Sequence, residues 1–189
     1  MDNYRSHLKL DFDPFEPGSN SRDFFTGGKR GDLLEQLIEL SLHSKSLAVV
    51  TGSLGSGKST LAKQICLSFR EDAECVLVGA TLFMNKPQFL EAIVEQLSLN
   101  PFEPSLSLQD SSDPGQAASL REEIIIENIC QLAAQLDLEA RAVILIVDDA
   151  HELGSDVIGT IEKMWGNANR SNLHIMLFGE NQLNNMLRT

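Results

Sequence analysis

Residues 46–60 read Ser-Leu-Ala-Val-Val-Thr-Gly-Ser-Leu-Gly-Ser-Gly-Lys-Ser-Thr, and this stretch decides the fold. The apolar, β-branched run at 46–51 is typical of a buried parallel strand. Residues 52–59 then satisfy the pattern G-x-x-x-x-G-K-[ST], the phosphate-binding loop or Walker A motif. Apolar residues at helical spacing follow, at Leu61, Ile65 and Phe69. Strand, loop and helix stand in the order that the motif requires, so the sequence predicts a nucleoside phosphate site.

The residue types in this loop suit a bound anion. Gly52, Gly55 and Gly57 can adopt positive φ, and they leave no Cβ between the backbone and a phosphate. The exposed N–H groups, with the positive end of the following helix dipole, form an anion cradle. We expect Lys58 to place its charge on the β- and γ-phosphates and the Ser59 hydroxyl to complete a Mg²⁺ site. The expected nucleotide-binding residues of the loop are Gly52, Ser53, Leu54, Gly55, Ser56, Gly57, Lys58, Ser59 and Thr60.

A second informative stretch ends in two carboxylates. Residues 142–147, Ala-Val-Ile-Leu-Ile-Val, predict a strand buried on both faces, and Asp148 and Asp149 follow it. This is the Walker B pattern, and in an open parallel sheet ligands lie beyond the carboxyl ends of the strands. We therefore expect Asp148 to hold Mg²⁺ and Asp149 to act as the general base that orients the attacking water. In the simpler alternative, the two acids only cap the strand.

The end of the fourth expected strand, at 173–178, is a further candidate for a nucleotide contact. Gly179-Glu180-Asn181-Gln182 follow this strand, and a polar side chain at this position can contact the γ-phosphate and so sense whether it is present. Asn181 is the residue expected to do so.

The first 30 residues are polar and turn-rich. Pro14 and Pro17 oppose a helix there, so we expect an extended arm laid over the domain and anchored by its phenylalanines. In the sharper interpretation, Phe15 also packs beside the nucleotide base, since a purine needs apolar walls with few polar groups.

The remaining periodicities complete an α/β pattern. The sequence predicts a strand at 75–80 and helices over 31–44, 86–97, 117–138 and 154–165. Because the Walker B strand does not directly follow the phosphate-loop unit, one strand is expected to lie between the two motif strands, as in additional-strand ATPases. The expected fold class is a three-layer α/β/α phosphate-loop NTPase, AAA+-like, with a mainly parallel sheet.

The expected organisation is an arm at 1–30 and an NTPase core at 31–189. Within the core, residues 99–117 carry three prolines and a glycine among serines and aspartates, which predicts a long surface loop. The loop is either a solvated insertion or a contact with a partner, and the sequence leaves both open.

Composition narrows the class of protein. The chain has 189 residues, suited to one domain, and 42% of them are hydrophobic, which is ordinary for a globular protein. Its net charge of −12 argues against a general affinity for nucleic acid or for an anionic membrane surface. The three cysteines have no C-x-x-C spacing and are expected to be buried free thiols in a cytoplasmic protein. No stretch reaches the length of a transmembrane helix, and Met1-Asp2-Asn3-Tyr4 does not begin a signal peptide.

The order of the segments resembles the ExeA/GspA-type AAA+ ATPases. The residues that carry the resemblance are Phe12-Asp13-Pro14-Phe15, Phe24-Phe25, the Walker A loop, Val147-Asp148-Asp149-Ala150-His151 and Leu177-Phe178-Gly179-Glu180-Asn181-Gln182-Leu183. Within that group, residues 11–28 and the Walker A loop are similar to the ATPase domain of DamX-like cell-division proteins. The resemblance covers nearly the whole chain, and its arm is more specific than its Walker motifs.

The resemblance implies ATP as the nucleotide, a place at the cytoplasmic face of the inner membrane and a link to the cell envelope. Relatives of this type continue through a membrane helix to a periplasmic SPOR domain, and the helical lid of AAA+ proteins would follow residue 189. We therefore expect a piece of a longer protein or a core without its lid, in which any membrane contact is made by segments outside this chain.

The chain departs from the family at two positions. Asp149 stands where the family commonly has Glu, and His151 stands where many relatives carry Gln. The Asp side chain is shorter by one methylene, so its carboxylate falls about 1 Å short of the water, a displacement that can be costly in rate. Slow hydrolysis is one expectation that follows.

Four functions remain open. The first is an ATPase that drives conformational change in a partner or oligomer, completed by an arginine from a neighbouring subunit, with Arg170 and Arg188 as candidates. The second is a nucleotide-binding switch or assembly module with little hydrolysis. The third is an ATPase of the DNA-transposition or helicase-loader type, which the acidic composition disfavours. A nucleotide kinase is a remote fourth, because no arginine-rich lid lies between the Walker motifs.

The expected ligands are ATP or ADP with Mg²⁺. ATP is preferred to GTP because Asn85-Lys86-Pro87-Gln88 lacks the final Asp of the guanine-specific N-K-x-D motif. Self-association or a partner in the envelope or division machinery is expected, and nucleic acid is not.

Overall fold

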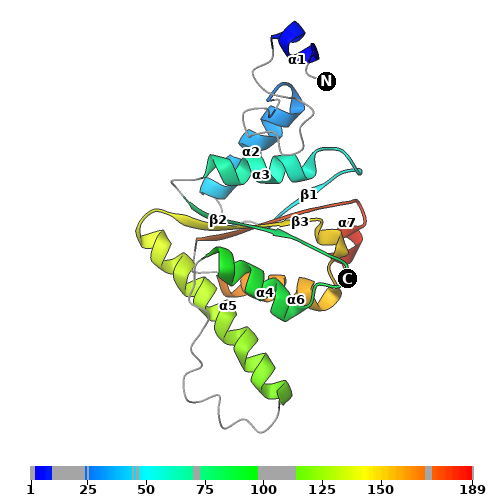
Figure 1. Ribbon diagram of the computed structural model, residues 1–189. Coiled ribbons are helices and arrows are strands. Elements are labelled where there is room, and N and C mark those ends of the chain that lie inside the picture. The colour runs from blue at the N-terminus through cyan, green and yellow to red at the C-terminus, as the bar shows by residue number, and fades with distance from the viewer. Residues whose placement is uncertain are drawn as a thin grey trace.

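The computed structural model describes residues 3–9, 24, 26–43, 45, 47–69, 73–97, 114–168 and 172–188. A parallel sheet lies between two layers of helices, as Figure 1 shows. This arrangement confirms the expected three-layer α/β/α fold.

The sheet has four strands, β1 (Leu47–Thr51), β2 (Ala73–Gly79), β3 (Ala142–Asp148) and β4 (Leu173–Gly179). Their order is β1-β4-β3-β2, and all neighbours are parallel. The strand β4 therefore lies between the strand that leads into the Walker A loop and the strand that ends in the Walker B acids. This confirms the inserted strand expected from the separation of the two motifs.

The helices divide between the two faces of the sheet. On one face lie α2 (Lys29–His43) and α3 (Lys58–Ser68), and on the other lie α4 (Lys86–Gln96), α5 (Pro114–Leu138) and α6 (Ser155–Asn167). The shorter helices are α1 (Asn3–Leu8), the 3₁₀ turn η3 (Ala150–Glu152) and α7 (Leu183–Met186).

Successive residues of β3 serve the two faces alternately, because side chains of a strand point to opposite sides. Val143, Leu145 and Val147 pack under α4, α5 and α6, and all three are at most 1% exposed. Ile144 and Ile146 are fully buried under α2 and α3. A strand with both faces covered has to be apolar throughout, which is why its sequence reads as an unbroken apolar run.

Two segments differ from the sequence-based expectation. Residues 3–8, placed in an extended arm by the sequence, form the helix α1, while residues 10–23 lie outside the described part of the chain. The helix expected from 117 begins at Pro114, because proline fits the first turn of a helix, where its missing N–H is not needed. Of the expected loop at 99–117, only 114–117 are described, and they are helical.

Candidate functional site

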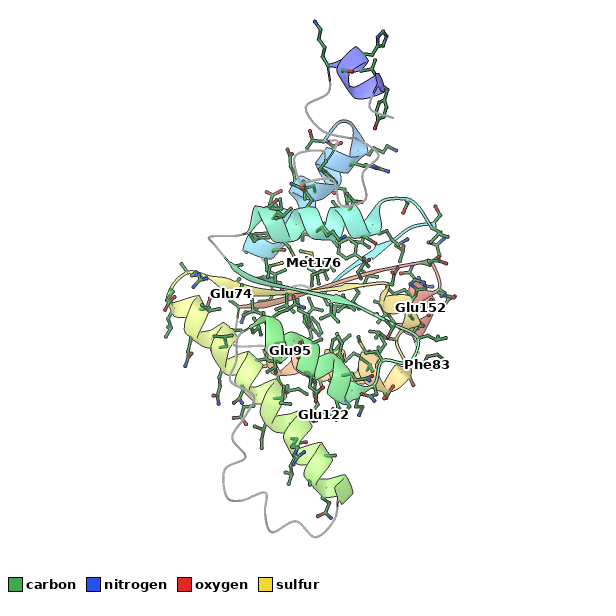
Figure 2. All side chains as sticks on the ribbon, in the orientation of Figure 1. Glu74, Phe83, Glu95, Glu122, Glu152 and Met176 are labelled. Carbon is green, nitrogen blue, oxygen red and sulfur yellow. The ribbon has the colours of Figure 1, made fainter. Side chains whose placement is uncertain are left out.

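The site is built at one end of the sheet. The strands β1, β3 and β4 are parallel, so the loop at 52–57, the acids Asp148 and Asp149, and the turn at 180–182 follow their strands at the same end. In Figure 2, Glu152 marks this end of the sheet, just beyond β3, and Glu74, near the start of β2, marks the other end. Met176 lies on the α3 side of the sheet. The N–H of Gly52 donates to the carbonyl of Gly179 over 3.1 Å, which ties the loop to the end of β4.

The loop has the glycine geometry of an anion cradle. Gly55 has φ of 74° and Gly57 has φ of 89°, conformations that side chains other than glycine strain to adopt. At Gly52 a Cβ would lie 2.8 Å from the Ser56 hydroxyl oxygen, so a larger residue there would force the Ser56 side chain to move. Gly57 is the N-cap of α3, so the amides of the first turn of this helix have no partner within the helix.

Lys58 folds back over the loop. Its ammonium donates to the carbonyls of Gly52 over 2.9 Å and of Ser53 over 3.0 Å. The positive charge is thereby held at the start of the loop. Ser59 and Thr60 are exposed in the first turn of α3, and Leu54 is 87% exposed at the tip of the loop.

A basic residue that the sequence analysis missed also contacts the loop. Arg30, in the first turn of α2, donates from Nη2 to the carbonyl of Ser56 over 3.0 Å. An exposed arginine near the start of a helix carries no sequence signal of its own. Only the packing of α2 beside α3 brings it to the loop.

The two Walker B acids differ in conformation. Asp148 completes β3, and its carboxylate accepts a hydrogen bond from the N–H of Asp149 over 3.1 Å. Asp149 is exposed and has φ of 53° and ψ of 34°, in the left-handed region. Such a backbone is uncommon outside glycine, and strained residues of this kind concentrate at functional sites.

His151 is buried behind these acids. Its side chain is 8% exposed, its Nε2 lies 3.5 Å from a carboxylate oxygen of Glu152, and its buried Nδ1 has no hydrogen-bond partner among the described residues. A Cβ added to Gly179 would lie 3.3 Å from that Nδ1, so the ring packs against the end of β4. This burial is typical of a histidine with a structural role.

The turn after β4 brings two side chains to this end of the sheet. Asn181 is exposed in the turn, at the same end as Lys58 and Asp148. Asn184, which the sequence analysis did not single out, donates from its amide to the Thr51 hydroxyl over 3.5 Å. The helix α7 is thus connected to the end of β1.

A cavity of about 200 Å³ opens beside the loop. Its apolar wall is formed by Phe24, Leu33, Val50 and Leu61, and Arg30 and the loop complete it. Phe24 belongs to the segment that the sequence places next to the base. Phe15, the residue predicted for that contact, lies outside the described residues.

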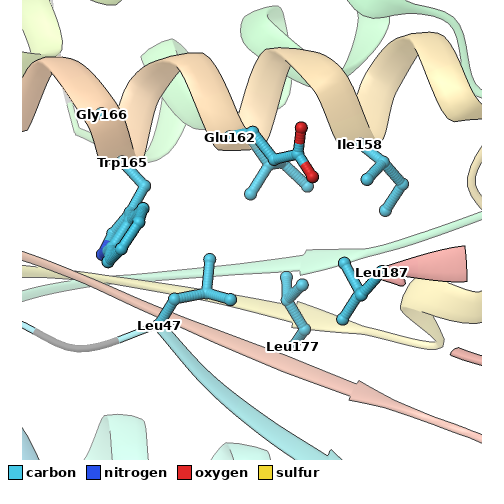
Figure 3. Close-up of a pocket in the computed structure, with 8 residues that line it drawn as sticks. Leu47, Ile158, Glu162, Trp165, Gly166, Leu177 and Leu187 are labelled. Atoms are coloured by element: carbon cyan, nitrogen blue, oxygen red, sulfur yellow. The ribbon is translucent and has the colours of Figure 1, made fainter. Parts of the chain in front are cut away.

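Another cavity, of about 390 Å³, lies on the opposite face of the sheet under α6. Figure 3 shows its walls, which are mostly apolar and include Leu47, Ile158, Trp165 and Leu177. Its lining contains no basic side chain, so it offers nothing to a phosphate.

Metal-binding clusters and the three cysteines were the remaining candidates for chemistry. No group of three or more His, Cys, Asp or Glu side chains that could hold a metal occurs in the described part of the chain. Cys66, Cys75 and Cys130 are free, as expected, but they are partly exposed and not buried as the sequence analysis expected. A hydrogen bond from Cys75 lowers the pKa of Cys66, and the same bond, with burial, raises the pKa of Cys75.

Of the two arginines suggested for the neighbouring subunit, Arg188 is exposed just after α7, and Arg170 lies outside the described residues. The described helices also include none that is both long and apolar enough to cross a membrane.

Comparison with known proteins identifies a family. The model of the family described as "AAA domain" matches residues 40–187. No curated protein matches the chain. Among solved structures, Cdc6p from Pyrobaculum aerophilum is 18% identical, with a TM-score of 0.60 over 92% of this chain and 43% of its own. PCH-2 from C. elegans is 15% identical, with a TM-score of 0.45 over 81% of this chain and 38% of its own. The chain thus spans less than half the length of either structure, and the likeness to Cdc6p concerns the fold.

Proposed function

Because this chain belongs to the AAA domain family, we propose that its phosphate loop binds MgATP and that the two Walker B acids support hydrolysis, which drives conformational or assembly changes in a larger protein or complex. One observation carries the proposal. A glycine cradle with Lys58 folded over it lies at the same end of the sheet as Asp148 and Asp149.

Each residue has a defined task in this proposal. The loop amides bind the phosphates, and Lys58 exchanges the carbonyls of Gly52 and Ser53 for β- and γ-phosphate oxygens. Ser59 and Asp148 are oxygen donors of the kind that suits Mg²⁺, which such sites bind through one or two protein groups plus phosphates. When bound, Mg²⁺ supplies charge that neutralises the phosphates. Asp149 orients the attacking water and accepts its proton.

The base end of the site is proposed for the cavity beside the loop. Phe24, Leu33 and Leu61 offer the apolar wall that a purine needs, and the cavity adjoins Gly57. Phe15 remains a proposed additional contact from the arm. Asn181, exposed at the same end of the sheet, is the proposed sensor of the γ-phosphate.

The biological setting is proposed from the resemblance to ExeA/GspA-type and DamX-like proteins. The resemblance implies a cytoplasmic domain at the inner membrane, attached to the membrane by segments outside this chain. This domain would act on a partner in the envelope or division machinery. Self-association belongs to the same proposal, with Arg188 or Arg170 completing the site of a neighbouring copy. The arm at 1–30 and the core at 31–189 are its proposed parts.

One observation favours a second function, a nucleotide switch with little hydrolysis. Asp149 is exposed, is shorter than the Glu common in the family, and stands on a left-handed backbone. A carboxylate placed about 1 Å from its best position can slow the chemical step by about 100-fold while binding is unaffected.

Equilibrium binding and single-turnover hydrolysis of ATP with Mg²⁺ test both functions. The variants are Lys58→Ala and Asp149→Asn, with Lys63→Ala as the control, because Lys63 is an exposed lysine of the same helix α3. The ATPase proposal expects Lys58→Ala to lose binding and Asp149→Asn to bind but not hydrolyse. If the wild type binds and does not hydrolyse, the switch is correct, and a wild type that does not bind refutes both.

A further inference from the structure

Arg30 contacts the phosphate loop in a specific geometry. Its Nη2 donates to the carbonyl of Ser56 over 3.0 Å. A Cβ added to Gly57 would lie 3.4 Å from Nη2, 3.5 Å from Cζ and 3.6 Å from Nη1. Three guanidinium atoms at nearly equal distances mean that the flat face of the group lies over Gly57. The bond and the packing together place this cation against the Ser56–Gly57 peptide.

The geometry of a peptide gives this contact its meaning. In a trans peptide the C=O and the N–H point in opposite directions. A hydrogen bond that fixes the Ser56 carbonyl therefore also fixes the Gly57 N–H, which points the opposite way, and a loop amide is the kind of group that binds a phosphate. In a glycine-rich loop this peptide can rotate at little cost, so an external partner is needed to select one orientation. The same bond polarises the peptide and strengthens its N–H as a donor.

The side of the loop on which Arg30 lies also limits its role. The Ser56 carbonyl and the Gly57 N–H point in opposite directions, so a group bound to this carbonyl lies on the side of the peptide opposite to a phosphate bound by that N–H. Arg30 is therefore not a second Lys58. It is exposed as well, so its charge acts on the ligand through water, and the fixed hydrogen bond is the stronger effect.

We propose that Arg30 is a positioning residue of the nucleotide site, which holds the Ser56 carbonyl so that the Gly57 N–H points at the bound phosphate. The inference rests on the proposed function. It predicts that Arg30 contributes to the affinity for the phosphate chain, with or without a base attached. An alternative role is stacking on the base, because Arg30 also lines the cavity with Phe24.

Competition binding separates these roles. The probe is fluorescent ADP, displaced by ADP, by ATP or by tripolyphosphate, which has no base. The variants are Arg30→Ala, Arg30→Gln and Arg30→Lys. Lys29→Ala is the control, because Lys29 is exposed in the same turn of α2 and its loss changes the net charge equally. The ligand-free melting temperature of each variant is measured alongside.

We expect Arg30→Ala to weaken ADP, ATP and tripolyphosphate alike by about fivefold to tenfold, the value of one hydrogen bond. Arg30→Lys and Arg30→Gln retain a donor and should recover part of the loss, while Lys29→Ala stays within about twofold, as an exposed charge does. The ligand-free melting temperatures should not differ, which excludes a general loss of stability.

Three results would overturn the inference. In the first, Arg30→Ala binds all three ligands as tightly as the wild type. In the second, Lys29→Ala loses as much affinity as Arg30→Ala. In the third, Arg30→Ala binds ADP more weakly but tripolyphosphate as tightly as the wild type, which would assign Arg30 to the base. In each of these the wild type still binds ADP, so the proposed function survives. If the wild type binds neither ADP nor ATP, the proposed function and the inference fall together.

Discussion

Replacing Asp149 by glycine should stabilise the protein and at the same time abolish hydrolysis. Asp149 has φ of 53°, and Ala140, in the turn between α5 and β3, has φ of 56°. Both are exposed residues in the left-handed region, but they stand at opposite ends of β3. Ala140→Gly is therefore a matched control that relieves the same strain far from the proposed site.

The magnitude follows from two opposing terms. The left-handed conformation costs a residue with a Cβ about 1–2 kcal/mol, which glycine recovers. Glycine also lowers the stability by about 0.4–1 kcal/mol, because it increases the conformational entropy of the unfolded chain. The net gain is about 0.5–1 kcal/mol, or about 1–4 °C in melting temperature for a domain of this size. Asp tolerates this conformation better than Ala, so Ala140→Gly should gain more.

Urea and thermal unfolding of the ligand-free protein measure the stability of both variants, and single-turnover hydrolysis measures function. Asp149→Gly should lose about 10²–10⁴-fold in hydrolysis, the usual worth of a general base. Its ATP affinity and the hydrolysis rate of Ala140→Gly should match those of the wild type. Destabilisation by both substitutions would refute the strain argument. Stabilisation without loss of hydrolysis would show that Asp149 is not the base.

Three further substitutions test the packing around the site. Gly57→Ala should weaken ADP binding by about fivefold to thirtyfold, since φ of 89° strains any residue with a Cβ by about 1–2 kcal/mol and the loop must shift to relieve that strain. Titration calorimetry measures the loss. Gly179→Ala should destabilise by about 1–3 kcal/mol in urea unfolding, because its Cβ would lie 2.9 Å from a methyl of Leu183. Burial and the nearby Glu127 charge raise the pKa of Cys130, because both disfavour the thiolate in the folded protein. The free energy of unfolding is therefore unaffected by this thiol below its ordinary pKa and falls as the pH rises above it. Cys130→Ala should therefore flatten the fall of the urea midpoint above about pH 9.

The fold was predictable because its strongest signals are local and redundant. The run at 142–147 is apolar on both faces because helices cover both sides of β3. The position of β4 followed from the distance between the Walker motifs rather than from any property of β4 itself. Element ends were less predictable, since Pro114 reads equally well as a loop residue and as the first residue of a helix.

The site was predictable only where a motif spans consecutive residues. Gly55 and Gly57 adopt the positive φ that the Walker A pattern requires, but the roles of Lys58 and Asp149 stay predictions. Arg30 could not be found from the sequence, because its partner Ser56 is 26 residues away and no spacing rule connects a helix start to a loop in another unit. The same holds for Asn184, which reaches Thr51 at the end of the neighbouring strand β1.

Gly179 contacts both Walker segments and so fixes their positions relative to each other. Its carbonyl accepts the N–H of Gly52 from the Walker A side, and its Cα packs against His151 from the Walker B side, so close that a Cβ would lie 3.3 Å from the His151 amide nitrogen. A displacement of either motif therefore has to move the end of β4 or break one of these contacts, because packed groups at such distances do not compress. The turn that leads to α7 starts at the next residue. In the proposed function, a change at the nucleotide would therefore pass from one motif to the other, and on to α7, through the end of β4.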